Sequence, residues 1–199
     1  MKAARWIAAG AGIAAAGAVA AIAHARQTEE PDYRVLRADG DVEVRDYPAL
    51  VVAEISNTGS RESASGASFR RLAAYIFAQD RPAGGEKIAM TAPVLQDEIA
   101  PGAWRMRFVM PARYTLATLP PAPSDIRLAE MPARRMAAVR FSGNATGGDL
   151  ALMEARLRDW MREAGLMPAG EAEYAFYNAP MVPGPLRRNE VLIPVATAG

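Results

Sequence analysis

The chain has 199 residues, of which 51% are hydrophobic and 23% are charged, and its formal net charge is +1. This balance is typical of a folded domain with its own core, and the small net charge gives no basic field that would attract nucleic acid. The absence of cysteine excludes disulfides, thiolate zinc sites and a catalytic thiol.

The N-terminal 25 residues have the features of a targeting segment. Lys2 and Arg5 precede an unbroken apolar run over 6–23, and Ala23-His24-Ala25 has the small-x-small pattern of a cleavage site. We interpret residues 1–25 as a signal peptide or as an uncleaved N-terminal signal anchor, which the short, Ala-rich run would make a weak permanent span. Either alternative places the rest of the chain outside the cytoplasm, periplasmic or exported, free or anchored to the inner membrane.

The first half of the remaining chain predicts strands, a helix and further strands. Alternating apolar residues indicate strands over 33–37, 42–45 and 50–55, with a tight turn at Asp39-Gly40 between the first two. An apolar stripe at helical spacing then predicts a helix, for which Ser63, Ser65 or Ser68 is a candidate N-cap. The stripe consists of Phe69, Leu72, Ala73, Ile76 and Phe77.

Two more strands complete this half. We expect one over 87–95, where Ile88, Met90 and Ala92 alternate with their neighbours, and one over 104–110. Pro93 lacks a backbone donor, so the first of these strands has to end, bulge or lie at a sheet edge there. The proline-rich stretch 119–125 predicts a stiff linker.

The same order of elements recurs after the linker. Strands are expected over 126–130, 134–141, 174–177 and 190–195. Between them a second apolar stripe predicts a helix, which Gly165 and then Pro168 would end. The second stripe consists of Leu150, Met153, Leu157, Trp160, Met161 and Ala164.

Short matches also link the two halves. Pro48-Ala49 corresponds to Pro132-Ala133, and Thr91–Val94 is echoed by Asn178–Met181, at nearly the same offset along the chain. We therefore predict an α+β domain over 26–199, built from duplicated strand-helix-strand halves that form a distorted antiparallel β-barrel flanked by two long helices. The two pseudo-repeats span about 32–118 and 125–196.

Several segments together resemble the SOUL/heme-binding protein family. The resemblance covers about residues 32–195, and its most specific parts are the Met-Thr-Ala-Pro-Val and Arg-Arg-Asn-Glu segments. It implies non-covalent binding of heme or other tetrapyrroles and kinship with bacterial effector-binding domains. The segments are Tyr47-Pro48, Phe69–Leu72, Tyr75-Ile76, Lys87–Val94, Pro121–Asp125, Phe141–Gly143, Ala179–Met181 and Arg187–Val191.

Catalysis is difficult to build from these residues. Beyond residue 25 the chain has neither His nor Cys, and Lys87 is its only lysine, so a serine nucleophile would depend on this one side chain as its base. The sequence has no zinc or calcium ligand pattern. We expect a binding protein and not an enzyme, with no catalytic residues and no metal-ion site.

We place the binding site beside the first helix. An apolar pocket there would bury a flat porphyrin while cations hold its propionates, and Met or Tyr would be the available axial ligands. Arg71 and Arg188 are further candidate cations, and Arg187–Glu190 is expected to start the last strand and tie it to the other half. The candidate cofactor-binding residues are Phe69, Arg70, Leu72, Ala73, Ile76, Lys87, Met90, Met110, Met181 and Arg187.

These features favour a carrier, buffer or sensor of heme or related tetrapyrroles outside the cytoplasm. One alternative is a binding module for another hydrophobic small molecule, as in effector-binding domains. Another is a membrane-tethered interaction protein, which requires the apolar run over 6–23 to remain uncleaved.

Overall fold

The computed structural model describes residues 28–81 and 85–196. The segment interpreted as a signal peptide or anchor lies outside the described residues. Within the described ranges, no helix is long and apolar enough to cross a membrane.

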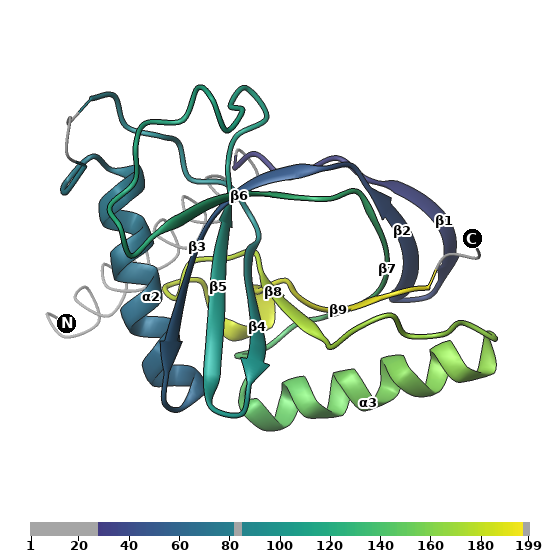
Figure 1. Ribbon diagram of the computed structural model, residues 1–199. Helices are drawn as coiled ribbons and strands as arrows, with labels where there is room; N and C mark the ends of the chain where they lie inside the picture. Colours follow the sequence, from purple (N-terminus) through teal and green to yellow (C-terminus); the bar gives the residue numbers. More distant parts are fainter. Residues whose placement is uncertain (1–27, 82–84, 197–199) are drawn as a thin grey trace, which may run out of the picture.

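Nine antiparallel strands form one sheet in the order β1-β2-β7-β9-β8-β4-β5-β3-β6, and the sheet curls into a half-barrel (Figure 1). The α+β class and the antiparallel pairing agree with the prediction, but the sheet has two edges, β1 and β6, and is therefore not a closed barrel. The strands are β1 Arg34–Asp39, β2 Val42–Tyr47, β3 Leu50–Thr58, β4 Val94–Ala100, β5 Ala103–Val109, β6 Arg127–Met131, β7 Arg134–Phe141, β8 Glu173–Phe176 and β9 Asn189–Pro194.

Two helices pack on the outer face of the sheet (Figure 1). Helix α2, Arg61–Ile76, lies against β3 and β5, and helix α3, Gly147–Glu163, lies against β7 and β9. A short 3-10 helix, η1 Gly184–Leu186, precedes β9. Each long helix buries one line of side chains and leaves the opposite face to water, as the helical spacing of their apolar residues predicts.

Three apolar clusters hold these layers together. Under α2, Leu72 and Tyr75 pack with the β5 residue Phe108, and under α3, Leu157 packs with Val139 and neighbouring strand residues. The third cluster lies on the opposite, concave face of the sheet. Its buried members are Val52, Leu95, Val109, Met131, Met136, Ala138, Ala175 and Leu192.

The strand predicted over 87–95 is mostly wrong, because β4 begins only at Val94. The preceding residues do not pair along a neighbouring strand, and their hydrogen bonds go to several different elements. The Ile88 amide donates to the Ile76 carbonyl at the end of α2 (2.8 Å), and the Ala92 amide donates to the carbonyl of Glu29 (2.9 Å). The Thr91 hydroxyl donates to the Val109 carbonyl. The segment therefore crosses from α2 to the sheet, and the Ala92–Pro93 peptide is cis.

The predicted repeat motif also fails at this point. Thr91–Val94 leads into β4, whereas Asn178–Met181 follows β8, so the two segments occupy different places in the fold. The resemblance between them reflects two proline-containing connections and not equivalent structural positions.

Short local signals fix where both long helices begin and where α3 ends. Ser60, and none of the three predicted serines, caps α2, and its side chain accepts from the Ser63 amide. Helix α3 begins with a capping box between Thr146 and Asp149. Gly165 follows α3 with φ of +69°, the left-handed conformation that glycine adopts most readily, so its predicted role as a helix terminator is confirmed.

Candidate functional site

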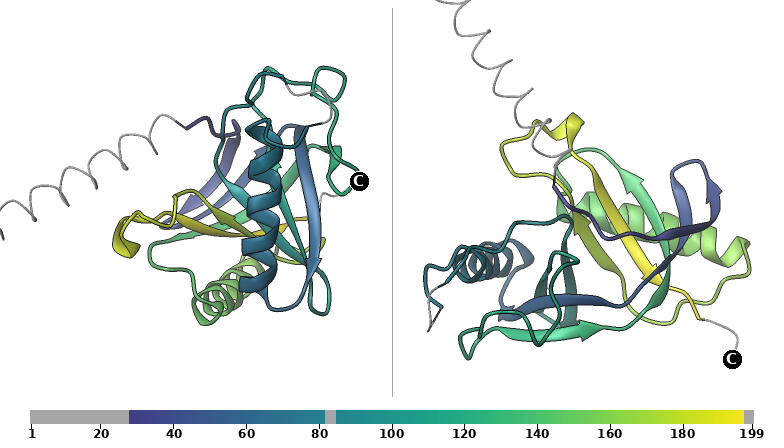
Figure 2. Two further views of the ribbon diagram at one scale, coloured as in Figure 1. Left: turned by 90° about the vertical axis from the view of Figure 1, so that its left-hand side faces the viewer. Right: turned by 90° about the horizontal axis from the view of Figure 1, so that it is seen from above.

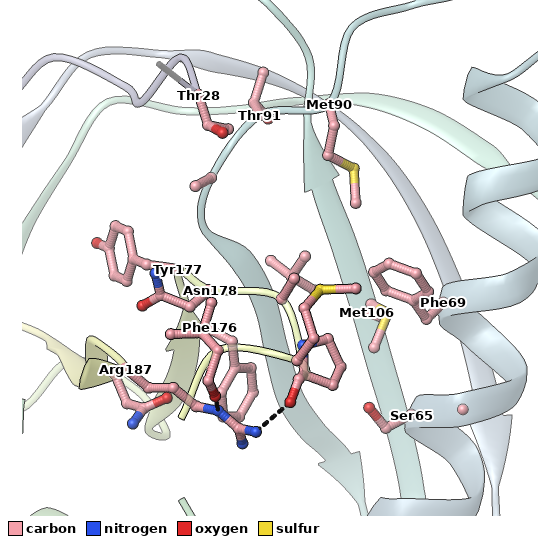
Figure 3. A pocket seen from close by; sticks show the side chains of 18 of the residues that line it. Thr28, Ser65, Phe69, Met90, Thr91, Met106, Phe176, Tyr177, Asn178 and Arg187 are labelled. Atoms are coloured by element: carbon pink, nitrogen blue, oxygen red, sulfur yellow. Dashed lines mark hydrogen bonds between the residues drawn. The ribbon is translucent and has the colours of Figure 1, made fainter. Parts of the chain in front are cut away.

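A cavity of about 540 Å³ lies between α2 and the connection from β8 to β9 (Figure 3). Its size falls within the range of pockets that hold small molecules and cofactors. The lining residues come from α2, from the crossing segment before β4, from the sheet and from the β8–β9 connection. They are Thr28, Ser65, Gly66, Phe69, Arg70, Met90, Thr91, Ala92, Val94, Met106, Asn144, Phe176–Val182, Arg187 and Asn189.

Helix α2 supplies one wall of the cavity. Its deeply buried line includes Ser68, Leu72 and Ile76, and Phe69 lies one residue out of that line. Phe69 is therefore 38% exposed and points into the cavity, with its ring edge-on to Phe108 at a centroid distance of 5.3 Å (Figure 3). The predicted stripe is correct for the core at Leu72 and Ile76, but Phe69 belongs to the cavity.

The floor of the cavity is the outer face of the sheet. Val94 of β4 pairs with Phe176 of β8, and Met106 lies on β5 beside them. Met90 descends from the crossing segment above this floor (Figure 3). Thioether, aromatic and aliphatic groups thus surround the cavity, and such a surface binds an apolar body by burial and dispersion.

The β8–β9 connection forms the opposite wall and is braced by its own contacts. Arg187 Nε donates to the Val182 carbonyl (2.7 Å), and the same guanidinium donates to the Pro180 carbonyl. Val182 is only 2% exposed and anchors the connection to the body of the protein by burial. The Gly143 amide donates to the carbonyl of Gly184 (3.0 Å) and ties the connection to the loop before α3.

Two arginines give the cavity a positive rim. In the part of the chain that the structure describes, neither Arg70 nor Arg187 has a carboxylate within ion-pair distance, and no acidic residue lines the cavity. Arg71, the next residue on α2, turns away and binds Asp125 through Nε (2.5 Å) and Nη2 (2.7 Å). The cavity therefore suits a ligand with an apolar body and an anionic edge.

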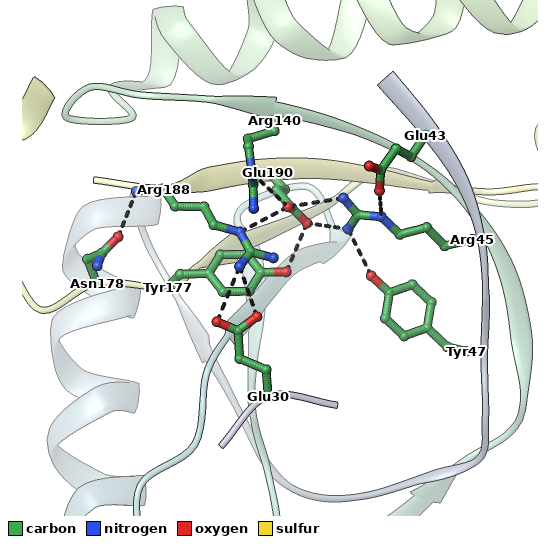
Figure 4. A network of polar contacts seen from close by, with 9 residues as sticks. All are labelled: Glu30, Glu43, Arg45, Tyr47, Arg140, Tyr177, Asn178, Arg188 and Glu190. Atoms are coloured by element: carbon green, nitrogen blue, oxygen red, sulfur yellow. Dashed lines mark hydrogen bonds and ion pairs between the residues drawn. The ribbon is translucent and has the colours of Figure 1, made fainter. Parts of the chain in front are cut away.

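A buried polar network backs the wall beside Tyr177 (Figure 4). Arg45 of β2 donates to Glu190 of β9 through Nη1 (2.6 Å) and Nη2 (3.2 Å), and the Tyr177 hydroxyl donates to the same carboxylate (2.8 Å). The Arg188 guanidinium lies 3.6 Å from the centre of the Tyr177 ring and also contacts Glu30. Arg45 and Glu190 lie in different predicted halves, so the expected tie between the last strand and the other half is confirmed.

Protonation in this network follows from burial and charge. Burial raises the pKa of the Tyr177 hydroxyl well above its ordinary value, and the neighbouring Glu190 carboxylate raises it further. Burial alone would raise the pKa of Glu190, but the hydrogen bond and charge of Arg45 outweigh it and lower that pKa. The network at neutral pH is thus a neutral tyrosine donating to a charged carboxylate.

Five of the ten predicted site residues line the cavity: Phe69, Arg70, Met90, Met181 and Arg187. The other five do not. Leu72, Ile76 and Met110 lie in the core cluster under α2, each less than 5% exposed, because the helix stripe faces the sheet. Ala73 is half-buried on α2, and Lys87 is exposed on the crossing segment, outside the lining.

Sequence reasoning missed most of the wall after β8. Phe176, Tyr177 and Asn178 line the cavity, and so does Asn144 from the loop before α3. The uncharged, proline-rich stretch 179–186, which no strand or helix pattern explains, could have drawn attention to the wall after β8 but not to Asn144.

The donor groups at the cavity can be compared with the needs of a heme group. The apolar floor fits a porphyrin, and the two arginines fit its propionates. Thioethers of Met90, Met106 and Met181 are the available soft donors for iron, because Tyr177 is held neutral and already donates to Glu190. The described residues also contain no group of three or more His, Cys, Asp or Glu side chains that could hold a metal ion.

Comparison with known protein families matches the SOUL heme-binding protein family over residues 28–194. The match covers most of the chain, and the protein belongs to this family. Comparison with curated protein sequences gives no significant match.

Comparison with solved structures finds a similar fold in proteins of low sequence identity. The C-terminal domain of EcmrR has a TM-score of 0.58 at 12% identity, covering 83% of this chain and 99% of that one. A hydrolase from Listeria innocua has a TM-score of 0.54 at 12% identity, covering 81% and 94%. An uncharacterized conserved protein from Listeria innocua has a TM-score of 0.56 at 12% identity, covering 78% and 92%. These similarities define the fold and not a shared activity.

Proposed function

We propose that this protein binds heme or a related tetrapyrrole non-covalently in the cavity beside α2, and that it acts as a carrier, buffer or sensor and not as an enzyme. The observation that carries this proposal is an apolar cavity of about 540 Å³ whose two rim arginines lack carboxylate partners, in a chain of the SOUL heme-binding family. A porphyrin has the matching shape, with a flat apolar body and an edge of two carboxylates.

Iron coordination has a secondary role in this proposal. Among the described residues, the lining groups suited to iron are methionine sulfurs, since the raised pKa of Tyr177 disfavours the phenolate form that ligates iron. Binding energy then comes mainly from burial of the ring and from the arginine–propionate contacts. Metal-free protoporphyrin should accordingly bind about as well as heme.

This expectation defines the test. The full chain is titrated with heme and, in parallel, with protoporphyrin IX, following the Soret band and the porphyrin fluorescence. We expect micromolar binding of both, with dissociation constants within about fivefold of each other. No Soret shift at tens of micromolar heme would reject the proposal, and so would a bis-histidine spectrum from a form that lacks residues 1–25.

A second candidate function uses the same cavity for another hydrophobic small molecule. The positive rim favours an anionic amphiphile, such as a fatty acid, over a cation. Extraction of the purified protein and identification of the bound molecule by mass spectrometry separates the two functions. A co-purifying lipid with no tetrapyrrole supports the second.

We further propose that the protein works outside the cytoplasm, exported by residues 1–25 or anchored through them. The support is the charged and then apolar pattern of that segment. N-terminal sequencing of the exported protein decides between the alternatives, because a start at Arg26 means cleavage.

The duplication of the two halves also belongs among our proposals. Its support is the strand order, which reads β8-β9-β7-β2 on one side of the β4–β8 junction and β4-β5-β3-β6 on the other. Apart from β1, each half has four strands, and its helix follows the second of them. The first of these four strands, β2 in one half and β6 in the other, lies in the side of the sheet that the other half mainly builds, so neither side would be complete alone.

A further inference from the structure

The connection between β8 and β9 carries apolar side chains on its outside. Met181, which lines the cavity, is 76% exposed, and Leu186, five residues further on in the same connection, is 53% exposed. Phe69 lines the cavity from α2. Figure 2 shows this yellow-green segment projecting from the body of the protein. We propose that residues 179–186, the apolar tip, dock onto a lipid bilayer with anionic headgroups and hold the mouth of the cavity against it.

The tip is suited to the membrane interface by its backbone as well as its side chains. Residues 179–186 contain no charged residue, and three of the eight are prolines, which have no amide donor to desolvate. The amides of Val182 and Leu186 are bonded within the tip, to the carbonyls of Ala179 (3.0 Å) and Pro183 (2.9 Å). Fewer backbone donors are left to lose water when the tip enters the headgroup region.

The tip is also preformed. Arg187 holds two of its carbonyls from inside, and a side chain built at Gly184 would come within 2.6 Å of the Asn144 side chain. A Cβ atom there would displace the end of the Asn144 side chain, and the bond from the Gly143 amide to the Gly184 carbonyl (3.0 Å) ties the tip to the loop before α3. Met181 and Leu186 are therefore exposed on a segment whose conformation is fixed by its own contacts.

Charge around the tip is complementary to an anionic bilayer. Arg70 and Arg187 flank it without carboxylate partners among the described residues. The nearby carboxylate of Glu30 is already neutralised by Arg188 (2.9 Å). Basic residues beside an inserted apolar group strengthen binding to anionic lipid.

The N-terminal sequence points to the same face. Thr28, the first described residue, lines the cavity, and the apolar run over 6–23 ends five residues before it. Five residues span at most about 18 Å even when fully extended. If the run stays in the membrane, the cavity rim lies within that distance of the bilayer. An apolar ligand could then exchange directly with lipid, a consequence that rests on the proposed function.

The absence of cysteine makes a clean test possible. Met181→Cys in the full chain is labelled with an environment-sensitive fluorophore and mixed with vesicles of phosphatidylcholine and phosphatidylglycerol, with and without spin-labelled lipid. Met167→Cys is the matched control, because Met167 is also a methionine and is 70% exposed. Its carbonyl accepts from the Ala196 amide, beyond the far end of β9, so it lies about 20 Å or more from the tip.

We expect emission at position 181 to shift to shorter wavelength and to be quenched by spin-labelled lipid, with neither change at position 167. Equal exposure to water at both positions overturns the proposal. A shift at position 181 before vesicles are added also overturns it, because a protein surface would then cover the tip.

A further variant pair measures the size of the effect. The labelled Met181→Cys protein is compared with the labelled double variant Met181→Cys/Leu186→Ser. The double variant should show lipid quenching weakened at least about tenfold, because one inserted apolar side chain is lost. All measurements use protein without added tetrapyrrole. Failure of heme binding therefore leaves this test intact, and failure of membrane docking leaves the heme titration intact.

Discussion

Arginine has opposite roles in two neighbouring regions of this protein. On the concave side of the sheet, Arg45 is buried with Glu190, and each nitrogen of its guanidinium group donates a hydrogen bond to a side-chain oxygen of the protein. At the cavity rim, Arg70 and Arg187 have no carboxylate partner among the described residues. A buried arginine paired with a carboxylate fixes the sheet, whereas an arginine at an apolar cavity that lacks a carboxylate partner keeps its charge available to an anionic ligand.

The same contrast occurs between adjacent residues of one helix. Arg70 and Arg71 differ by about 100° around α2, so one faces the cavity and the other reaches the linker at Asp125. Residue type alone therefore carries no information about role here. What decides it is whether a carboxylate lies within reach.

The largest effect should follow from breaking the buried pair. Glu190→Ala leaves the buried Arg45 with only the partly exposed Glu43 as a counter-charge, which should lower the free energy of unfolding by about 3–5 kcal/mol. For a chain of this size that corresponds to a fall in Tm of about 6–20 °C. Urea and thermal unfolding measured by circular dichroism give both values.

Two controls show whether the effect belongs to the buried charge. Glu171→Ala removes a carboxylate whose side chain is 86% exposed and should change stability by less than about 1 kcal/mol. Arg45→Met combined with Glu190→Leu should recover much of the loss, because the two fully buried charges are then removed together and the groups that lose a partner, such as Glu43 and Arg140, are partly exposed. A double variant as unstable as Glu190→Ala would mean that packing, and not charge, sets the cost.

Alkaline pH probes the same network through Tyr177. The pKa of this hydroxyl is raised in the folded protein from the usual 10.0, so above pH 10 the unfolded chain loses a proton that the folded protein keeps. Stability should therefore fall as pH rises above about 10, by about 1.4 kcal/mol per pH unit from this group. Tyr47, whose burial raises its pKa to about 12, adds in the same direction.

Tyr177→Phe isolates this contribution. The variant should lose some stability at pH 7 because Glu190 loses a donor, but its stability should fall less steeply between pH 10 and 11.5. Unfolding in urea at several pH values measures the slope. An unchanged slope would show that Tyr177 is not the titrating group.

Much of the fold can be predicted from local sequence patterns. The strand predicted over 134–141 coincides with β7, and most other strands differ by one to three residues at their ends. The α3 stripe buries Leu150, Leu157 and Met161 as its spacing predicts. These elements are predictable because period and burial agree along each of them.

The crossing segment before β4 and the wall after β8 are not predictable in this way. Ile88 alternates like a strand residue, yet it is buried under α2 and bonded to its last turn. Tyr177 and Asn178 become cavity residues only because β8 pairs with β4 across the sheet. Both features depend on long-range pairing, which alternation in one segment cannot specify.

A smaller effect should separate the two neighbouring arginines. Arg70→Gln should weaken heme binding about fivefold, the value of one partly exposed charge contact to a propionate. Arg71→Gln removes the same charge one residue away and should leave heme affinity unchanged, with only a small loss of stability from the Asp125 pair. Titration by the Soret band compares the two. Equal weakening by both variants would mean that long-range charge, and not contact at the rim, holds the ligand.

Ionic strength should produce the smallest and most specific difference. The rim arginines are partly open to solvent, so raising salt from 0.05 M to 0.5 M should screen their attraction for the propionates and lower heme affinity about twofold to threefold. In Arg70→Gln one of the two screened contacts is already absent, and the salt dependence should be correspondingly shallower. The unfolding free energy set by the buried Arg45–Glu190 pair should respond much less to salt, because water and ions do not reach it. If stability and heme affinity changed in parallel with salt, the distinction between paired and unpaired arginines would be wrong.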